Sequence, residues 1–197
     1  MSKKELLDTV AFEVVVCTKC ELWKSRKKAV PGEGNSEARI IFIGEAPGLS
    51  EDAQGRPFVG KAGRSLEELL RGVGLSRADV FICNIVKCRP PRNRGPHQTE
   101  VRTCTPYLDR QIKVIEPRFI VTLGNYSTAY VFSKAGVSFS GITQVHGKSY
   151  LTTVLGLDVV VFPTFHPASA LYYPRYKEML MEDFQKLRTV LARESDL

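Results

Sequence analysis

Four short runs of Ile, Val and Phe, separated by segments with helical spacing, constrain the fold of this chain more than any other feature. They occupy residues 38–43, 80–86, 118–124 and 159–165. Strands of a parallel sheet are buried on both faces by helices, so they read as near-continuous apolar runs. The sequence therefore predicts a three-layer α/β/α sandwich with a four-stranded parallel central sheet.

Helical signals fill the segments around these runs. We expect helices at residues 3–16, 61–73, 99–115, 125–136 and 174–192. Pro106 falls inside the third of these, which is therefore expected to kink or to start late. The fourth apolar run is expected to form the second half of a hairpin over residues 148–162. No internal repeat is present, and we expect a single domain over residues 1–197.

Composition and charge narrow the class of protein. No run of 18 apolar residues exists, so no transmembrane helix is predicted. The N-terminus lacks a continuous apolar stretch with a cleavage site, so it is not read as a signal peptide, and we expect a cytoplasmic protein. The net charge of +7 fits a solvated basic surface as well as a nucleic-acid-binding one. Residues 87–94, KCRPPRNR, hold four cations and no acid, which predicts a loop that faces anions.

The cysteines are spaced for metal binding. Cys17 and Cys20 form a C-x2-C pair, and Cys88 and Cys104 are separated by 15 residues. Two thiolates on a tight turn and a remote pair can complete four-coordination of a metal or cluster. The second pair lacks the tight spacing of zinc knuckles, which favours a [4Fe–4S] cluster over zinc, with free thiols or a disulfide as the remaining alternatives. Cys83, inside an apolar run, is expected to be a small buried hydrophobe.

A glycine-rich segment, GEAPGLSEDAQGRPFVGKAG, follows the first apolar run at residues 44–63. It matches neither common phosphate-loop motif, and the acidic Glu45 would repel a phosphate. Gly44 and Gly48 allow the backbone to approach a ligand closely, while Phe58 offers a stacking face. The segment therefore predicts the wall of a pocket for a flat molecule.

Two further strand ends carry polar side chains. The amide of Asn84 offers one donor and one acceptor, which matches the N3–H and O4 edge of a pyrimidine. The alternative is an Asn that only forms a turn. His166 follows the last run and precedes a proline, so its ring is held in a restricted loop. A ligand contact and a purely structural role both remain open for it.

The motifs in their order resemble those of the family 4 uracil-DNA glycosylases, the iron–sulfur branch of the uracil-DNA glycosylase superfamily. The matching motifs are GEAPG, GRPFVG, N-x3-CRPP-x-NR, C-x15-C and HPA, and the similarity runs from Cys17 to about Leu171. The resemblance implies a repair enzyme that flips uracil out of DNA and hydrolyses its N-glycosidic bond, leaving an abasic site. The implied partner is uracil-containing DNA, double- or single-stranded. A replication sliding clamp is a further candidate partner, no membrane is expected, and the protein is expected to be a monomer.

The resemblance also implies roles for individual residues. One [4Fe–4S] cluster would be held by Cys17, Cys20, Cys88 and Cys104. The uracil pocket would be formed by Gly44, Glu45, Ala46, Gly48, Phe58, Asn84 and His166. Catalysis would rest on Glu45, Asn84 and His166, with Asn84 reading the base edge and His166 near O2. Glu45 would position the water or exclude the methyl group of thymine, since Ala46 stands where a related branch has Asp.

DNA contacts are expected next to this pocket. Three arginines of the basic loop would bind DNA phosphates whatever the base sequence, namely Arg89, Arg92 and Arg94. The alternative is a charged loop that contacts only solvent. Leu171 would fill the space that the flipped base vacates, or else pack against the C-terminal helix. A DNA-binding zinc module and a nucleotide hydrolase are the competing functions. A zinc module would not require the polar residues at the strand ends. A nucleotide hydrolase would require a Walker-type Lys or clustered Asp residues, and the sequence contains neither.

Overall fold

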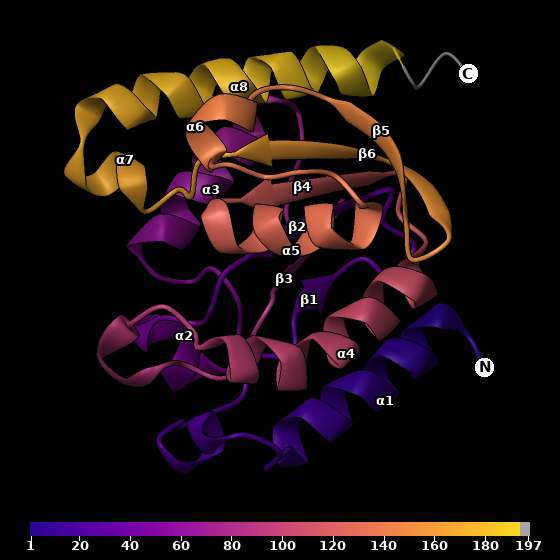
Figure 1. The fold of residues 1–197 in the computed structure, drawn as a ribbon, viewed down its shortest axis with the longest axis vertical. Coiled ribbons are helices and arrows are strands. Elements are labelled where there is room, and N and C mark those ends of the chain that lie inside the picture. The colour runs from indigo at the N-terminus through magenta and orange to yellow at the C-terminus, as the bar shows by residue number, and fades with distance from the viewer. Residues whose placement is uncertain (194–197) are drawn as a thin grey trace.

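The structure is a computed structural model that describes residues 1–193; the last four residues of the expected domain, 194–197, lie outside the described part. Its strands form one mixed sheet in the order β1-β3-β2-β4-β6-β5 (Figure 1). The strands are β1 (Glu33–Gly34), β2 (Ile40–Gly44), β3 (Phe81–Asn84), β4 (Phe119–Leu123), β5 (Tyr150–Val154) and β6 (Leu157–Thr164).

The sheet is mixed, unlike the four-stranded parallel sheet that was expected, and the hairpin expected over residues 148–162 is present as β5 and β6. The four apolar runs do form β3, β2, β4 and β6, which are parallel to one another at the centre of the sheet. However, β1 is antiparallel to β3 and β5 is antiparallel to β6, so the sheet has six strands and is mixed. Leu155 and Gly156 both have positive φ angles, 54° and 87°, which suits the tight turn that folds β5 back beside β6.

The expected helices are confirmed, and each begins and ends within two residues of its predicted bounds. The α-helices are α1 (Lys3–Val16), α2 (Leu49–Gln54), α3 (Lys61–Gly72), α4 (Gln98–Ile115), α5 (Asn125–Ala135), α6 (Ile142–Val145), α7 (Ser169–Tyr172) and α8 (Pro174–Arg193), with 3-10 turns η1 (Glu21–Lys24) and η2 (Pro91–Asn93). Pro106 lies inside α4, and this helix does not start late. None of the described helices has the length and hydropathy needed to cross a bilayer.

Helices cover both faces of the sheet. Phe42 of β2 stacks on Phe184 of α8, with ring centroids 6.1 Å apart, and pairs in register with Val121 of β4. The next residue of β4, Thr122, meets Thr128 of α5 through their hydroxyls at 2.8 Å. Adjacent residues of a strand point to opposite faces, so α8 and α5 lie on opposite sides. Figure 1 shows α5 in front of the strands, with α1 running alongside α4.

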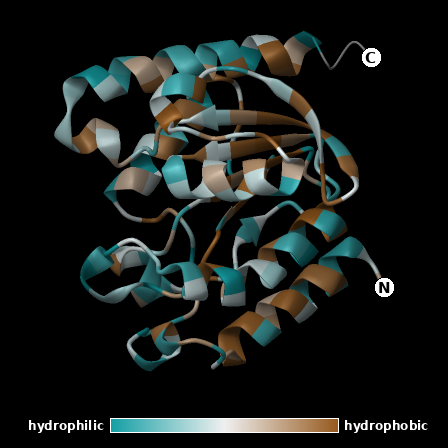
Figure 2. Cartoon of the chain, in the orientation of Figure 1, coloured by the Kyte–Doolittle hydropathy of each residue, from teal (hydrophilic) through white to brown (hydrophobic). Residues whose placement is uncertain are grey.

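The core is continuous from α1 to α8, and the strands are its most apolar part, coloured brown in Figure 2. The parallel strands β2, β3 and β6 end at Gly44, Asn84 and Thr164, and their carboxyl ends share one edge of the sheet. Gly44 and Asn84 are also paired in register. Ligands of open α/β sheets bind outside this edge, so the segments that follow these three strands can meet there.

Candidate active site

A cavity of about 430 Å³ lies at the carboxyl edge of the parallel strands. Its wall is formed by Glu45, Ala46, Pro47, Gly48, Glu51, Phe58, Ala62, Asn84, Pro90, Asn93, Arg94, His166, Ala168 and Tyr172. Six of the seven predicted uracil-binding residues are among them, although their role in binding stays a prediction. Gly44, the seventh, lies beneath the wall, where a Cβ would collide with Asn84 Oδ1 and come to 2.7 Å from Phe58 Cζ. Glycine at this position therefore keeps room for the two side chains.

Phe58 is held in an unusual backbone conformation. Its φ is 52°, a region that non-glycine residues rarely adopt. The ring is buried and stacks on His166, with centroids 5.6 Å apart and planes 27° from parallel. The two rings, which are 108 residues apart in sequence, thus form one aromatic side of the cavity.

Glu51 organises the loop that carries Phe58. One carboxylate oxygen accepts hydrogen bonds from the backbone N–H groups of Val59 and Gly60, both at 2.8 Å. The other oxygen accepts from the N–H of Gly48 at 3.1 Å, at the start of α2. From the sequence Glu51 was only a more distant candidate for holding a water, although a Glu three residues after the N-cap is the acidic half of a capping box.

Asn84 is the buried polar group of the cavity. It is 2% exposed, and its Oδ1 is, in the part of the chain that the structure describes, the one buried side-chain oxygen or nitrogen without a hydrogen-bond partner. Buried polar atoms are almost always paired, so an orphaned acceptor in a cavity wall marks a place where a ligand N–H fits. This geometry favours the reading of Asn84 as a contact to a ligand over that of a mere turn residue.

His166 presents a neutral ring to the cavity. Burial lowers its pKa to about 4, and the charge of Glu51 opposes this only partly. Nδ1 accepts a hydrogen bond from the N–H of Ala168 at 3.1 Å. The proton of the neutral ring therefore resides on Nε2, which makes His166 a hydrogen-bond donor at neutral pH.

Glu45 lines the cavity with a carboxylate that has no partner among the described contacts. Its side chain is half-buried, and burial raises its pKa. Among the described contacts its carboxylate makes no hydrogen bond or ion pair, unlike those of Glu51 and of Asp52, which accepts from the N–H of Lys27 at 2.9 Å. Glu45 can therefore accept a hydrogen bond from a molecule in the cavity.

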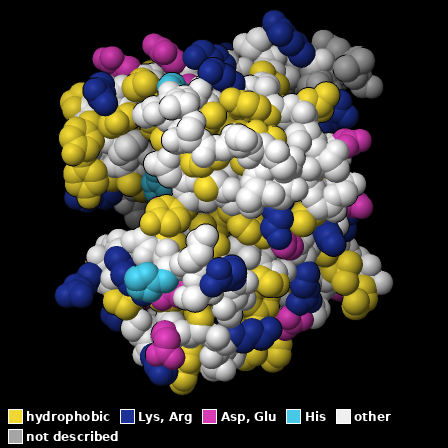
Figure 3. Space-filling view, viewed as in Figure 1, with side chains coloured by type: hydrophobic (Ala, Val, Ile, Leu, Met, Phe, Trp, Pro, Cys, Tyr) yellow, Lys and Arg dark blue, Asp and Glu magenta, His cyan; other side chains and the backbone are white. Residues whose placement is uncertain are grey.

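The three predicted phosphate-binding arginines differ in their surroundings. Arg94 lines the cavity and donates two hydrogen bonds to the buried carboxylate of Glu100, at 2.9 and 2.7 Å. Arg89 donates to Asn93 Oδ1 at 2.7 Å, whereas Arg92 is exposed. Since Glu100 compensates the charge of Arg94, Arg92 is the most available of the three for an external anion. Figure 3 shows Lys and Arg side chains scattered over the viewed face, with Asp and Glu side chains among them.

The segment after β6 exposes apolar side chains beside the cavity. Leu171 is 43% exposed and Tyr172 is 76% exposed, and Tyr173 beyond them is also exposed. Figure 3 shows hydrophobic side chains gathered at the edge where Figure 1 places α7. This exposure favours an external contact for Leu171 over packing against α8. Sequence reasoning missed Tyr172, which lines the cavity, because no motif marks it.

The four cysteines predicted as ligands surround one small cavity. Cys17, Cys20, Cys88 and Cys104 all line it, and Trp23 and Tyr107 cover its sides. None of the cysteines forms a disulfide, and Cys83 lies buried in β3, outside this cavity, as expected. As they are placed in the structure, no three or more His, Cys, Asp or Glu side chains among residues 1–193 are arranged to hold a metal ion, although the four cysteines line one cavity.

Two of the sulfur atoms accept hydrogen bonds. Arg26 donates to Cys88 Sγ at 3.0 Å, and the backbone N–H of Lys87 donates to Cys104 Sγ at 3.2 Å. Burial raises the pKa of the Cys104 thiol to about 12, and Lys87 opposes this shift. The Lys87 side chain, in a residue that is 1% exposed, donates to the backbone oxygen of Asn84 at 2.9 Å and to Gln111 Oε1 at 2.7 Å. Lys87 thus lies between the cysteines and the strand end that carries Asn84.

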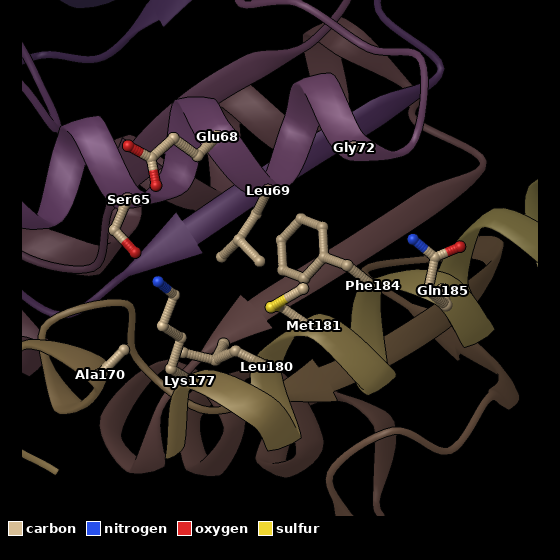
Figure 4. A pocket seen from close by; sticks show the side chains of 10 residues that line it. All are labelled: Ser65, Glu68, Leu69, Gly72, Ala170, Lys177, Leu180, Met181, Phe184 and Gln185. Carbon is tan, nitrogen blue, oxygen red and sulfur yellow. The ribbon is translucent and has the colours of Figure 1, made fainter. Parts of the chain in front are cut away.

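A second cavity, of about 300 Å³, lies between α3 and α8 (Figure 4). Its wall is largely apolar, with Leu69, Met181 and Phe184 at the centre and Glu68 and Lys177 towards one end. It contains none of the strand-end residues. Of these two cavities, only the larger one is lined by the polar side chains at the strand ends.

Comparison with known proteins agrees with this geometry. The family model of the uracil DNA glycosylase superfamily matches residues 31–188. The type-4 uracil-DNA glycosylase of Sulfurisphaera tokodaii is 54% identical over 92% of this chain and 83% of its own. That of Saccharolobus solfataricus is 54% identical over 94% and 87%, and that of Archaeoglobus fulgidus is 45% identical over 96% of both.

The match covers the segments that build the larger cavity, from Gly44 to Tyr172. Both the family model and the relatives span most of the chain, and the fold positions the matching motifs around one site. The chain belongs to the uracil DNA glycosylase superfamily and, within it, to the type-4 uracil-DNA glycosylases.

Proposed function

We propose that this chain removes uracil from DNA by hydrolysing the N-glycosidic bond, which leaves an abasic site for base excision repair. The observation that carries the proposal is the buried, unpartnered Oδ1 of Asn84 in the wall of a cavity that Phe58 and His166 also line. The names of the three relatives described above, each a type-4 uracil-DNA glycosylase, support the same activity.

Recognition uses a base that has been flipped out of the stack. Phe58 stacks on one face of the uracil. Asn84 Oδ1 accepts the N3–H of the base, which satisfies the orphaned acceptor, and its amide donates to O4. Cytosine has no N3–H, so it leaves the Asn84 acceptor unsatisfied. It also has an amino group in place of O4, and this donor would face the donor NH₂ group of Asn84.

Cleavage separates a cationic sugar from an anionic base. As the N1–C1′ bond breaks, its electron pair moves onto uracil, and His166 Nε2–H donates to the developing charge on O2. The ring suits this task because its pKa of about 4 keeps it neutral, so no proton is lost on forming the bond. A pre-aligned donor of this kind is typically worth about 3 kcal/mol in the transition state.

Glu45 is proposed to orient the water that attacks C1′. Its carboxylate has no protein partner among the described contacts. It can therefore accept a hydrogen bond from the water and then take a proton from that water. The water oxygen bonds to C1′ of the cationic sugar, Glu45 takes the proton that the water loses and gives it up to solvent, and the uracil anion takes a proton from solvent on release, so the products are free uracil and an abasic sugar. Excluding the thymine methyl group is the alternative role of Glu45.

The four cysteines are proposed to hold one [4Fe–4S] cluster. The donor set fits, because four sulfur atoms from three separate segments line one cavity and Arg26 and Lys87 supply positive charge beside them. Four thiolates carry a large negative charge, which buried cations stabilise. When bound, the cluster would cross-link the turn at Cys17 to the loop that carries the arginines.

DNA is proposed to lie across the mouth of the cavity. Arg92 and Arg89 would contact phosphates, Arg94 would act at the cavity edge, and Leu171 and Tyr172 would enter the space left by the base. Contact with a sliding clamp, a monomeric state and a cytoplasmic location stay predictions.

The test is release of uracil from an oligonucleotide with one uracil, as duplex and as single strand. The protein is purified anaerobically and its visible absorbance is recorded first. We expect brown protein that leaves alkali-labile sites, and about 10² to 10³-fold slower release by Asn84→Ala, with DNA binding retained. Absence of release on both substrates would refute the activity. Active but colourless protein would refute the cluster alone, and a fully active Asn84→Ala would refute the pocket assignment.

A further inference from the structure

Arg77, in the turn after α3, holds the backbone of Phe58 from outside the cavity. Its Nη1 donates to the carbonyl oxygen of Phe58 at 2.9 Å, and its Nη2 donates to that of Pro57 at 2.6 Å. Its side chain is only 19% exposed. A single guanidinium therefore binds two successive carbonyls of the loop that carries the aromatic residue of the site.

The conformation of Phe58 needs such support. A non-glycine residue with a φ of 52° is strained, and strain of this kind persists only where surrounding groups hold the backbone in place. Glu51 binds the two N–H groups that follow Phe58, and Arg77 binds the two carbonyls at and before it. At Gly63 a Cβ would collide with the Phe58 carbonyl, so the glycine leaves room for the path that this carbonyl takes. The loop is thus fixed on both sides of the strained residue.

Arg77 is itself rigidly anchored. Its Nη2 and Nε contact the same oxygen of Glu33 in β1, at 2.5 and 3.2 Å, and its Nη1 lies 3.4 Å from Glu67 of α3. Glu33 also forms a two-point ion pair with Arg56, at 2.7 and 3.0 Å. The guanidinium is therefore held between the edge strand and a helix. Charge-assisted hydrogen bonds at several points fix the geometry of an Arg side chain.

We propose that Arg77 is a positioning residue for recognition of the base: it sets the angle at which the Phe58 ring faces the uracil. The inference rests on the proposed function, since it takes Phe58 as the stacking face. Arg77 does not line the cavity, so it acts on the base only through the backbone of residues 57–58. Its loss affects binding of the base within the cavity and leaves the contacts to the phosphates unchanged.

Arg56 provides a matched control. It is exposed and pairs with the same carboxylate of Glu33, but it makes no bond to the backbone of residues 57–58 among the described contacts. An effect that arises from weakening the Glu33 ion pairs would appear in both Arg56→Ala and Arg77→Met. An effect that arises from releasing the Phe58 carbonyl would appear in Arg77→Met alone.

The experiment measures three quantities for the parent, Arg77→Met, Arg77→Lys and Arg56→Ala. These are kcat and KM on a single-uracil duplex, the inhibition constant of free uracil, and the Kd for the same duplex without uracil. For Arg77→Met we expect kcat/KM to fall by roughly ten- to a hundredfold and inhibition by uracil to weaken by a similar factor, with the Kd unchanged. Arg77→Lys, which can bind one carbonyl, should recover part of the loss, and Arg56→Ala should stay within about twofold.

The outcomes separate the inference from the activity on which it rests. An active parent whose Arg77→Met variant keeps both its kcat/KM and its inhibition by uracil would overturn the inference alone. Equal losses in Arg56→Ala and Arg77→Met would also overturn it, because they would trace the effect to Glu33. A parent that releases no uracil from either strand form would overturn the proposed function and this inference together. The Kd and circular dichroism verify that each variant compared is folded.

Discussion

Lowering the pH should destabilise the folded protein through His166. The folded pKa of this ring is about 4, below the ordinary value of 6.5, because burial disfavours the charged form. The stability that neutral His166 contributes is fully present above pH 6.5. It is lost as the pH falls towards 4, since the unfolded chain then binds a proton that the folded chain does not.

The size of this effect follows from the two pKa values. The pKa of about 4 in the folded state lies about 2.5 below that of the unfolded chain, which corresponds to about 3 kcal/mol of unfolding free energy once the pH is well below 4. About 2 kcal/mol of this stability should be lost between pH 7 and pH 5. Replacing His166 by Gln removes the titrating group but keeps a side chain that can donate and accept. The parent should therefore lose about 2 kcal/mol more than His166→Gln over this interval.

Urea unfolding at several pH values, followed by circular dichroism, measures the difference directly. Subtracting the unfolding free energy of the variant from that of the parent cancels the contributions of titrating groups that both proteins contain. These include Glu45, whose raised pKa changes stability with pH in the opposite direction. Parallel pH profiles for the two proteins would show that His166 titrates normally in the folded state. It would then be partly protonated near pH 6.5, and the neutral donor invoked for catalysis would be wrong.

Two further predictions concern the basic loop and the cysteines. Arg92→Ala should weaken DNA binding and reduce the slope of log K against log[salt] by about 1, as titration at several salt concentrations would show. Arg94→Ala should instead lower the melting temperature, because it leaves Glu100 buried without its cation; equal salt slopes for both variants would contradict this division. Cys104→Ser should abolish the visible absorbance of the purified protein, whereas Cys83→Ser should keep it. Loss of colour in both, or in neither, would refute the proposed ligand set.

The sequence was sufficient for the centre of the sheet and for the hairpin that places β5 at one edge, but it did not indicate β1 at the other edge. Strands β2, β3, β4 and β6 are buried on both faces, so their apolar runs were recognisable. The edge strand β5 alternates between half-buried and exposed residues, with Leu151 82% exposed, and β1 contains only two residues. An edge strand is stabilised by a neighbour on one side only, and nothing in its composition has to be apolar throughout.

For the candidate site, the sequence predicted which residues converge but not what supports them. Glu45, Asn84 and His166 each follow a parallel strand, and the topology of such a sheet brings these positions together. The contact of Arg77 with Phe58 and the pairing of Arg94 with Glu100 depend on the paths of loops. Those paths are set by packing and leave no periodic pattern in the sequence.

The acidic residues of the first loop illustrate this difference in full. Glu45, Glu51 and Asp52 lie within eight residues of one another, and the sequence favours Glu45 for holding a water only because it is nearest to the position of Ala46. In the structure both oxygens of Glu51 accept backbone N–H groups, and Asp52 is buried and accepts the N–H of Lys27. Carboxylates used in this way keep a loop in shape, and removing them should unfold it. Of these three, Glu45 alone combines a place in the cavity wall with a carboxylate that has no protein partner among the described contacts, which is why Glu45 is the residue proposed to orient the water.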